Sequence, residues 1–433
     1  MFSISKIMRF LTLREKTFNI FLIGIFFLSI FSVAAINYLA NPFGVFPANS
    51  LVEYSGIHFN SNVRIYKTFL VKRRKPDGLL LGSSRMEASM SPTETAWPGL
   101  NAYNMAMAGA SMHEILRNLQ HANAITPLKQ VLIGLDFFMF SSAHKGVSDF
   151  SEDYFAVTES GERKPDTYVI RTYVNVLFSA DSLTRSASQI IKPPKKRPLV
   201  TNDDNGMVSL AALNSTVQDN AAVYQIFDSV ENTYFKKGTV WLNGPNSTYT
   251  TIKDASGANT YDDLRALLEY IYSNNLNVAL MIPPIHGHML QGLDGIGLWP
   301  AYLTWKKQLT LVNEQIADKY HQPVKALWDF GLVTSMTTEL LPEDPQLPAP
   351  KNGMQWFWDP GHPKPAFADL IQERIFVSGT QDIGKILNSS MMDNHLAEQT
   401  AALHQYEEND PATRQAIREK LESLNTWQWI KSE

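Results

Sequence analysis

The chain has 433 residues, of which 44% are hydrophobic and 18% are charged, and its formal net charge is −4. This composition is typical of a folded protein and argues against extended disorder. No broad basic field is present to attract nucleic acid or an anionic lipid surface. Because the sequence contains no cysteine, disulfides, thiolate nucleophiles and cysteine-bound zinc are excluded.

The first feature along the chain is an apolar run at residues 18–39 that contains no charged side chain. About twenty helical residues cross the ~30 Å hydrocarbon layer of a bilayer, so this run predicts a transmembrane anchor. Four basic residues precede it, and the positive-inside tendency therefore places residues 1–17 in the cytoplasm and the chain after residue 40 outside. Those residues are Lys6, Arg9, Arg14 and Lys16.

Two other interpretations of this run remain open. Val33-Ala34-Ala35 resembles the small-residue cleavage site of a secretory signal peptide. The apolar core of such a peptide is usually about 7–15 residues long, so the longer run favours an uncleaved anchor. A buried helix of a soluble core is less consistent with the run, because such a helix normally keeps one polar face.

Beyond the anchor, the sequence predicts an α/β domain. Asn41-Pro42-Phe43-Gly44 ends the apolar helix, and the basic cluster at residues 72–75 is expected to be a solvated face. The apolar runs at residues 79–81 and 131–135 predict buried strands of a parallel sheet. Between them, Ser111-Met112-His113-Glu114 is a capping box that predicts a helix to about residue 125.

The rhythm of strands and helices is interrupted and then resumes. Residues 141–255 lack clear periodicity, with a proline-rich loop at residues 193–198, and are interpreted as an insertion or cap. We therefore expect one domain over residues 41–390 with an insertion at about 141–260, followed by a helical tail over residues 391–433. The later elements are predicted as helices near 261–273 and 301–320, strands at 278–282 and 324–328, and a helix that ends near 376.

Three segments supply the parts that serine hydrolysis needs. Ser84 directly follows the first predicted strand, where a neighbouring glycine permits a tight turn. The segment from Asn104 to Gly109 precedes a capped helix, so its amide and backbone N–H groups could stabilise an oxyanion. Asp359 and His362 lie three residues apart in a Pro/Gly turn, an arrangement that lets a carboxylate orient an imidazole toward the serine.

These segments, in this order, resemble the sequence blocks of the SGNH hydrolase superfamily. Gly82-Ser83-Ser84-Arg85 is similar to the first block, Asn104 to Gly109 to an oxyanion block, and Asp359 to His362 to the terminal block. The resemblance implies a three-layer, parallel-sheet α/β fold with Ser84 as nucleophile, His362 as base and Asp359 as its orienting group. It also implies Asn104 and Gly109 as oxyanion donors.

One block departs from the family pattern. After the strand at 131–135, the family has Gly-x-Asn, whereas this chain has Gly134-Leu135-Asp136. An ionised carboxylate cannot donate to an oxyanion. Three explanations stay open: Asn104 replaces that donor, the oxyanion is held more weakly, or the site is degenerate.

The membrane-anchored branch that the chain resembles includes proteins for O-acylation of alginate and cell-wall polymers. This implies a bacterial inner-membrane protein with a periplasmic domain that works on an acyl-carrying polysaccharide beside a membrane-bound O-acyltransferase. No cofactor or metal is expected. The alternative is a catalytically inactive factor for polysaccharide assembly or export. A metal-dependent deacetylase that uses His286 and His288 is a third hypothesis.

Five further side chains are candidates for substrate binding. Arg85 could pair with an acidic sugar or instead with Glu87 or Asp136. The aromatic residues near the last block could stack on sugar rings or pack the core. The candidate set is Arg85, Asp136, His286, His288 and Trp358, and the aromatic set is Trp299, Trp305, Trp356, Phe357 and Trp358.

Overall fold

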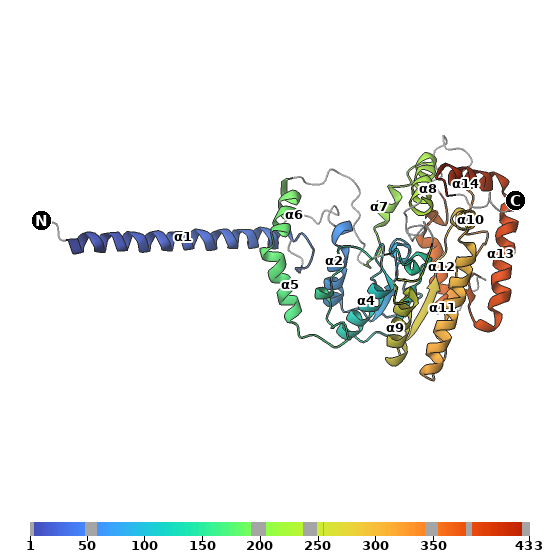
Figure 1. The fold of residues 1–433 in the computed structure, drawn as a ribbon, viewed down its shortest axis with the longest axis horizontal. Helices are drawn as coiled ribbons and strands as arrows, with labels where there is room; N and C mark the ends of the chain where they lie inside the picture. Colours follow the sequence, from blue (N-terminus) through green and yellow to red (C-terminus); the bar gives the residue numbers. More distant parts are fainter. Residues whose placement is uncertain are drawn as a thin grey trace.

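The computed structural model is a mixed α/β protein with one long N-terminal helix and a mostly parallel sheet (Figure 1). It describes residues 4–47, 59–144, 146–191, 205–236, 249–253, 255–342, 354–377 and 383–426. The predicted loop at residues 193–198 lies outside these ranges.

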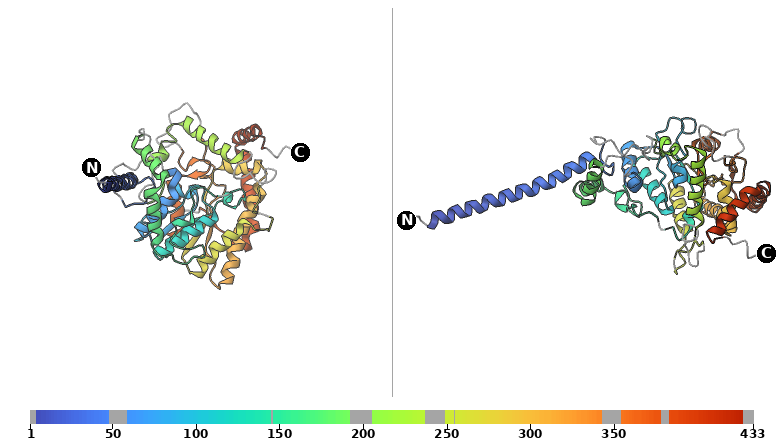
Figure 2. Two further views of the ribbon diagram at one scale, coloured as in Figure 1. Left: turned by 60° about the vertical axis from the view of Figure 1, so that its left-hand side comes forward. Right: turned by 90° about the horizontal axis from the view of Figure 1, so that it is seen from above.

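The N-terminal helix α1 (Ile4–Ala40) projects away from the body of the protein in Figure 1 and in the right-hand view of Figure 2. Its stretch Glu15–Ala40 is long and apolar enough to cross a membrane. Only 6% of its most apolar window is buried, and Phe18, Ile20 and Leu28 are 61–70% exposed. α1 is therefore not a core helix. It ends where predicted, with Asn41 in the left-handed region at φ 44°.

Six strands form the main sheet, in the order β2-β1-β3-β4-β5-β8. All neighbouring pairs are parallel except β5 and β8, which are antiparallel. The predicted strands are present as β1, β3 and β4. The bounds are β1 Gly78–Leu81, β2 Ala102–Asn104, β3 Gln130–Gly134, β4 Val278–Ile282, β5 Leu327–Asp329 and β8 Lys385–Ile386.

The sheet is the middle of three layers, because its strands β1, β3 and β4 are buried on both faces. Leu79 and Leu81 of β1 point into one core, which is shared with α2, α4, α9 and α11. Leu80 points into the other core, which is shared with α8 and α12. This continuous burial explains why the strands are apolar runs rather than alternating sequences. The bounds are α2 Phe59–Arg74, α4 Met112–Ile125, α8 Asn220–Phe235, α9 Thr260–Ser273, α11 Trp299–Lys319 and α12 Pro365–Phe376.

The predicted insertion contains helices that the sequence pattern did not predict. α5 (Thr167–Phe178) and α6 (Ala180–Ile191) lie across the end of α1, whereas α7 (Leu210–Asn214) and α8 are part of the body (Figure 1). The polar tail forms α13 (Met392–Asn409) and α14 (Pro411–Ser423), separated at the predicted proline. The domain boundaries proposed from the sequence stay a prediction.

Several local expectations need correction. The predicted strand at 324–328 begins only at Leu327, and α10 (Gly287–Gly295) was not foreseen. The basic cluster at 72–75 is not simply a solvated face. Lys72 bonds Asp166, and Arg73 donates to the carbonyl oxygens of residues 44 and 45, so these cations attach α2 to neighbouring segments.

His121 on α4 links three segments through both ring nitrogens. Its Nε2 lies 3.0 Å from the backbone carbonyl oxygen of Thr68 on α2, and its Nδ1 accepts from the Ala156 N–H at 2.9 Å. Burial lowers the pKa of His121 from 6.5 to about 4. The folded state therefore resists a proton that the unfolded chain accepts below pH 6.5. The stabilisation of the fold by neutral His121 is complete above pH 6.5, and it is lost as the pH falls toward 4.

We predict that replacing His121 weakens the acid sensitivity of the fold. Linkage over this pKa difference corresponds to about 3 kcal/mol of unfolding free energy. The His121→Gln variant should lose less of its melting temperature than the wild type between pH 7.5 and pH 5, as measured by tryptophan fluorescence in detergent. His404→Gln at an exposed site is the control. An identical loss in all three proteins would contradict the prediction.

Candidate active site

Ser84 lies at the carboxyl end of β1 and begins the short helix α3 (Ser84–Glu87). Gly82 precedes it at φ 149°, and a Cβ there would approach the Met86 Cγ to 2.4 Å. The glycine is thus required both by its backbone conformation and by the packing of Met86. Ser84 itself is half-buried, whereas Ser83 and Arg85 on either side of it are buried. Of the two adjacent serines, only Ser84 therefore reaches the surface.

Asp359 and His362 come from the small hairpin of β6 (Phe357–Asp359) and β7 (His362–Pro363). Asp359 Oδ1 accepts from the backbone N–H groups of Gly361 at 2.7 Å and His362 at 3.1 Å. The same carboxylate meets His362 Nδ1 at 2.8 Å through Oδ2. Asp359 therefore fixes both the turn and the plane of the imidazole that the turn carries.

The hairpin brings His362 to the serine. His362 Nε2 lies 2.8 Å from Ser84 Oγ, although the two residues are 278 positions apart in the chain. With the Nδ1 proton held by Asp359, Nε2 is free to accept the serine proton. The His362 side chain is 20% exposed, so the imidazole can be reached from solvent. The three residues selected from the sequence thus converge within hydrogen-bond distance.

A buried guanidinium next to the serine joins the three loops of the site. Arg85 Nε donates to the Gly361 oxygen at 2.9 Å, which connects the serine segment to the Asp359/His362 turn. Its Nη1 pairs with Asp136, directly after β3. The Ser83 hydroxyl donates to the other oxygen of Asp136. The loops after β1, after β3 and between β6 and β7 are therefore held in one arrangement.

The charge of Arg85 is retained despite its burial. Burial alone would lower its pKa, but the Asp136 carboxylate and the neighbouring Tyr234 outweigh that effect and raise it. The guanidinium carbon also lies 5.6 Å from the ring centre of Phe138 and 5.7 Å from that of Tyr234. Of the two partners considered from the sequence, Asp136 rather than Glu87 pairs with Arg85. Neither Arg85 nor Asp136 is a freely exposed substrate contact, since each is at most 3% exposed.

The expected oxyanion role of Asn104 does not agree with its contacts. Its Nδ2 donates to the Met86 oxygen at 2.8 Å and to the Met90 oxygen at 2.7 Å, which occupies both amide hydrogens. Its Oδ1 accepts from the Ala106 N–H. Asn104 is fully buried and holds the segment after α3 against β2. The expectation that Asn104 donates to an oxyanion is therefore corrected. The sequence block contains the Asn104 amide but does not determine the direction in which it points.

The backbone N–H groups of the serine segment and of the segment from Asn104 to Gly109 differ in whether they have an acceptor. Between Asn104 and Gly109, the N–H of Met107 bonds the Gly82 oxygen and that of Ala108 bonds Glu87. Among the hydrogen bonds between described residues, neither the Ser84 N–H nor the Gly109 N–H has an acceptor. Gly109 is also in the left-handed region at φ 66°. An oxyanion role for Gly109 and for the serine N–H stays a prediction.

His286 and His288 are structural links and do not form a metal pair. His286 Nε2 lies 2.7 Å from the backbone carbonyl oxygen of Glu339, and its Nδ1 accepts from the His288 backbone N–H at 3.2 Å. His288 Nδ1 lies 2.9 Å from Glu231. The His286 N–H donates to the Pro360 oxygen, so this pair supports the Asp359/His362 turn from behind. Within the described ranges, no group of three or more His, Asp or Glu side chains could hold a metal ion.

The tryptophans near the turn pack the core and do not form a sugar-stacking face. Trp358 is 4% exposed, with the Lys364 ammonium 4.5 Å from its ring centre. Trp299, Trp305 and Phe357 are at most 4% exposed. Trp356 is half-buried against Phe367. The expectation that Trp358 binds substrate is therefore corrected.

Helix α8 covers the site and was missed from the sequence. Val230 lies beside Gly361, at 3.8 Å from a Cβ built there, and Tyr234 faces Arg85. Burial raises the pKa of Tyr234, and the charges of Asp136 and Asp359 act in the same direction. The signal that could have found this helix is the spacing of Val223, Phe227, Val230 and Tyr234 after the capping Asp219.

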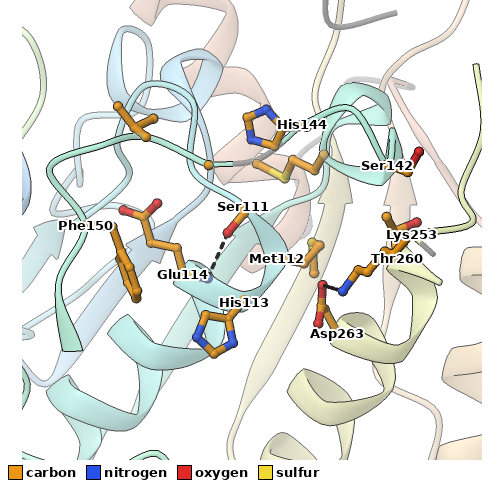
Figure 3. Close-up of a pocket in the computed structure, with 13 residues that line it drawn as sticks. Ser111, Met112, His113, Glu114, Ser142, His144, Phe150, Lys253, Thr260 and Asp263 are labelled. Atoms are coloured by element: carbon orange, nitrogen blue, oxygen red, sulfur yellow. Dashed lines mark hydrogen bonds and ion pairs between the residues drawn. The ribbon is translucent and has the colours of Figure 1, made fainter. Parts of the chain in front are cut away.

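A cavity of about 430 Å³ lies between the segments that follow β2 and β3, the neighbours of β1 (Figure 3). His144 forms part of its wall, with Nε2 3.1 Å from the Gly109 oxygen. The His144 ring also meets Phe138 at 5.2 Å, and Phe138 faces Arg85 on the serine segment. The cavity therefore adjoins Gly109. The other lining residues include Ser111, His113, Glu114, Ser142, Val147, Phe150 and Lys253.

We predict that Asp136→Asn destabilises the fold. It removes the charge that compensates Arg85, and breaking such a buried pair typically costs about 3–5 kcal/mol. The melting temperature of this variant should fall clearly below that of the wild type. Asp153→Asn, at an exposed pair 3.8 Å from Arg171, should change it little. Equal melting temperatures for the two variants would show that the buried pair does not hold the site.

The geometry of the site is thus established by this chain's own contacts. Comparison of the sequence with protein-family models finds no match, and comparison with curated proteins finds none either.

Proposed function

We propose that the chain is an SGNH-like serine esterase or O-acyltransferase. The observation that carries this proposal is the continuous relay from Asp359 through His362 to Ser84, with 2.8 Å between Nε2 and Oγ. A serine, an imidazole and a carboxylate in this order are the parts needed for acyl transfer. The position of Ser84 outside the carboxyl end of a parallel strand is also typical of sites on open α/β sheets.

The proposed reaction has two steps. Ser84 Oγ attacks the ester carbonyl while His362 Nε2 takes its proton, and Asp359 stabilises the resulting imidazolium. The N–H groups of Ser84 and Gly109 are the proposed donors to the oxyanion. His362 then protonates the departing alcohol, which leaves an acyl group on Ser84. Water or a sugar hydroxyl, deprotonated by the same imidazole, attacks this acyl-enzyme and regenerates the serine.

The proposed substrate is an acyl group, most simply acetyl, on a polysaccharide outside the cytoplasm. This proposal combines the esterase geometry with α1, which is apolar and long enough to hold the domain at a bilayer. The proposed location is a bacterial inner membrane, with the domain in the periplasm. A membrane-bound O-acyltransferase is the proposed partner, because the resemblance to polysaccharide O-acylation proteins implies one.

The cavity beside Gly109 is the proposed place for the sugar part of the substrate. Its charged lining groups are largely paired: Lys253 bonds Asp263, and Glu114 bonds Arg64. Burial lowers the pKa of His144, which favours a neutral ring. A cavity of hydroxyls, imidazoles and compensated charges beside the Phe150 ring suits a neutral polyhydroxy ligand (Figure 3).

We predict that the esterase activity depends on Ser84 and His362. Ser84→Ala and His362→Ala should each lower the kcat for p-nitrophenyl acetate by about 1000-fold or more, because either change breaks the relay. The double variant should be no worse than the single variants, since the two groups act as a unit. The measurement is release of p-nitrophenol by the full chain in detergent.

Matched controls for this experiment are Ser160→Ala and His404→Ala, at exposed sites away from the relay. Both should keep wild-type rates. Equal rates in the wild type and in both relay variants would contradict the enzyme proposal and favour a binding factor for polysaccharide export.

We further predict that filling the cavity affects large substrates selectively. Val147→Trp places an indole at a 39% exposed lining position. The kcat/KM for acetylated xylan should fall by about tenfold or more, which is roughly 1.4 kcal/mol. The rate on p-nitrophenyl acetate should be unchanged. Val324→Trp, at a 50% exposed position outside the cavity lining, is the control. An equal loss of kcat/KM on both substrates would contradict the proposal that the cavity binds the sugar part of the substrate.

A further inference from the structure

Helix α5 has two apolar faces, and only one of them is covered. Its inner face contributes the buried residues Tyr168, Thr172 and Val176, and Val176 packs in a small core with Phe46 and Phe69. Ile170, Val174 and Phe178 each lie two positions further along, which is about 200° around a helix. These three residues are 62%, 48% and 46% exposed. They therefore form a second apolar face of α5, on the side opposite the core.

Helix α6 repeats this arrangement with a polar inner face. Ser182, Ser186 and Gln189 are buried, while Ile190 and Ile191 are 54% and 74% exposed. Scattered apolar side chains are normal on a protein surface, but five of them on two consecutive helices mark an interaction surface. We call Ile170, Val174, Phe178, Ile190 and Ile191 the apolar stripe.

The two helices contact the end of α1, and this position determines which way the apolar stripe faces. α5 and α6 lie crosswise at the end of α1, and the rest of the domain lies beyond them (Figure 1). The Asn37 amide of α1 donates to the Leu177 oxygen at 2.9 Å, and the Ser186 hydroxyl donates to Asn37 Oδ1 at 2.9 Å. Because the core side of α5 faces the domain, its stripe faces the side from which α1 arrives.

The length of α1 places this junction at a membrane boundary. Lys16 is the last charged residue before the apolar stretch. About twenty helical residues cross the ~30 Å hydrocarbon layer, so a helix that enters near Lys16 leaves it near residue 36 or 37. Among residues 15–40 of α1, Asn37 is the first that is fully buried, at 0% exposure, and its side chain bonds α5 and α6.

We propose that α5 and α6 lie flat in the outer interface of the bilayer, with the apolar stripe against the acyl chains and the core face toward the domain. This proposal depends on α1 crossing the bilayer and is independent of the catalytic proposal. An interfacial helix buries its apolar face about 5–10 Å into the boundary between headgroups and acyl chains. The domain is then attached to the membrane by α1 and also by α5 and α6, which run crosswise to α1. This second attachment restricts how far the domain can tilt about α1.

The absence of cysteine from the sequence permits a direct test with single cysteines. The full chain carrying Val174→Cys is labelled with an environment-sensitive fluorophore and reconstituted into phosphatidylcholine vesicles. Phe26→Cys on α1 is the control for a lipid-embedded site, and Glu419→Cys on α14 is the control for a water-exposed site. Ile170→Cys is a second position on the stripe, and unchanged melting temperatures confirm that the variants are folded.

Quenching by iodide and by lipids with a shallow doxyl group measures the two environments. We expect iodide to quench the label at Val174→Cys roughly fivefold less than at Glu419→Cys, and doxyl lipid to quench it strongly. Iodide quenching equal to that at Glu419→Cys would overturn the proposal. Protection from both quenchers would overturn it as well, because a second copy of the chain would then cover the stripe. Failure at Phe26→Cys would instead refute the spanning of α1.

Discussion

The site depends on one buried cation, the Arg85 guanidinium. Arg85 follows the serine directly, and its hydrogen bonds reach the Gly361 carbonyl and the Asp136 carboxylate. The serine, the histidine turn and the loop after β3 come from regions of the chain that are far apart, so chain connectivity does not align them. A buried charge must be compensated where it lies, and this requirement fixes the three loops relative to one another.

The parts of the site that could be predicted are those determined locally. Gly82 and the strand before it place a hydroxyl at the end of β1, and the Asp359/His362 turn is built from its own backbone N–H groups. The orientation of Asn104 could not be predicted in this way. Its amide is used by the carbonyls of Met86 and Met90, whose positions depend on the packing of α3.

The fold shows the same division. Strands buried on both faces are apolar runs, so β1, β3 and β4 were predicted. The strand β2 has only three residues, and β8 is exposed and pairs with the edge through two residues, so neither has a distinctive pattern. Helix α8 has helical spacing, but the polar segments around it obscured the period. Its contact with Arg85 is a tertiary relation that no local pattern contains.

Asp136 stands where the SGNH proteins that the sequence resembles have the Asn of a Gly-x-Asn block, and the partner of Asp136 accounts for the carboxylate. An asparagine could offer a donor there but could not neutralise Arg85, which is 2% exposed. The carboxylate compensates this cation and also accepts a hydrogen bond from the Ser83 hydroxyl beside Ser84. The aspartate and the arginine are therefore one structural unit, and a carboxylate at this position is not by itself a sign of a degenerate site.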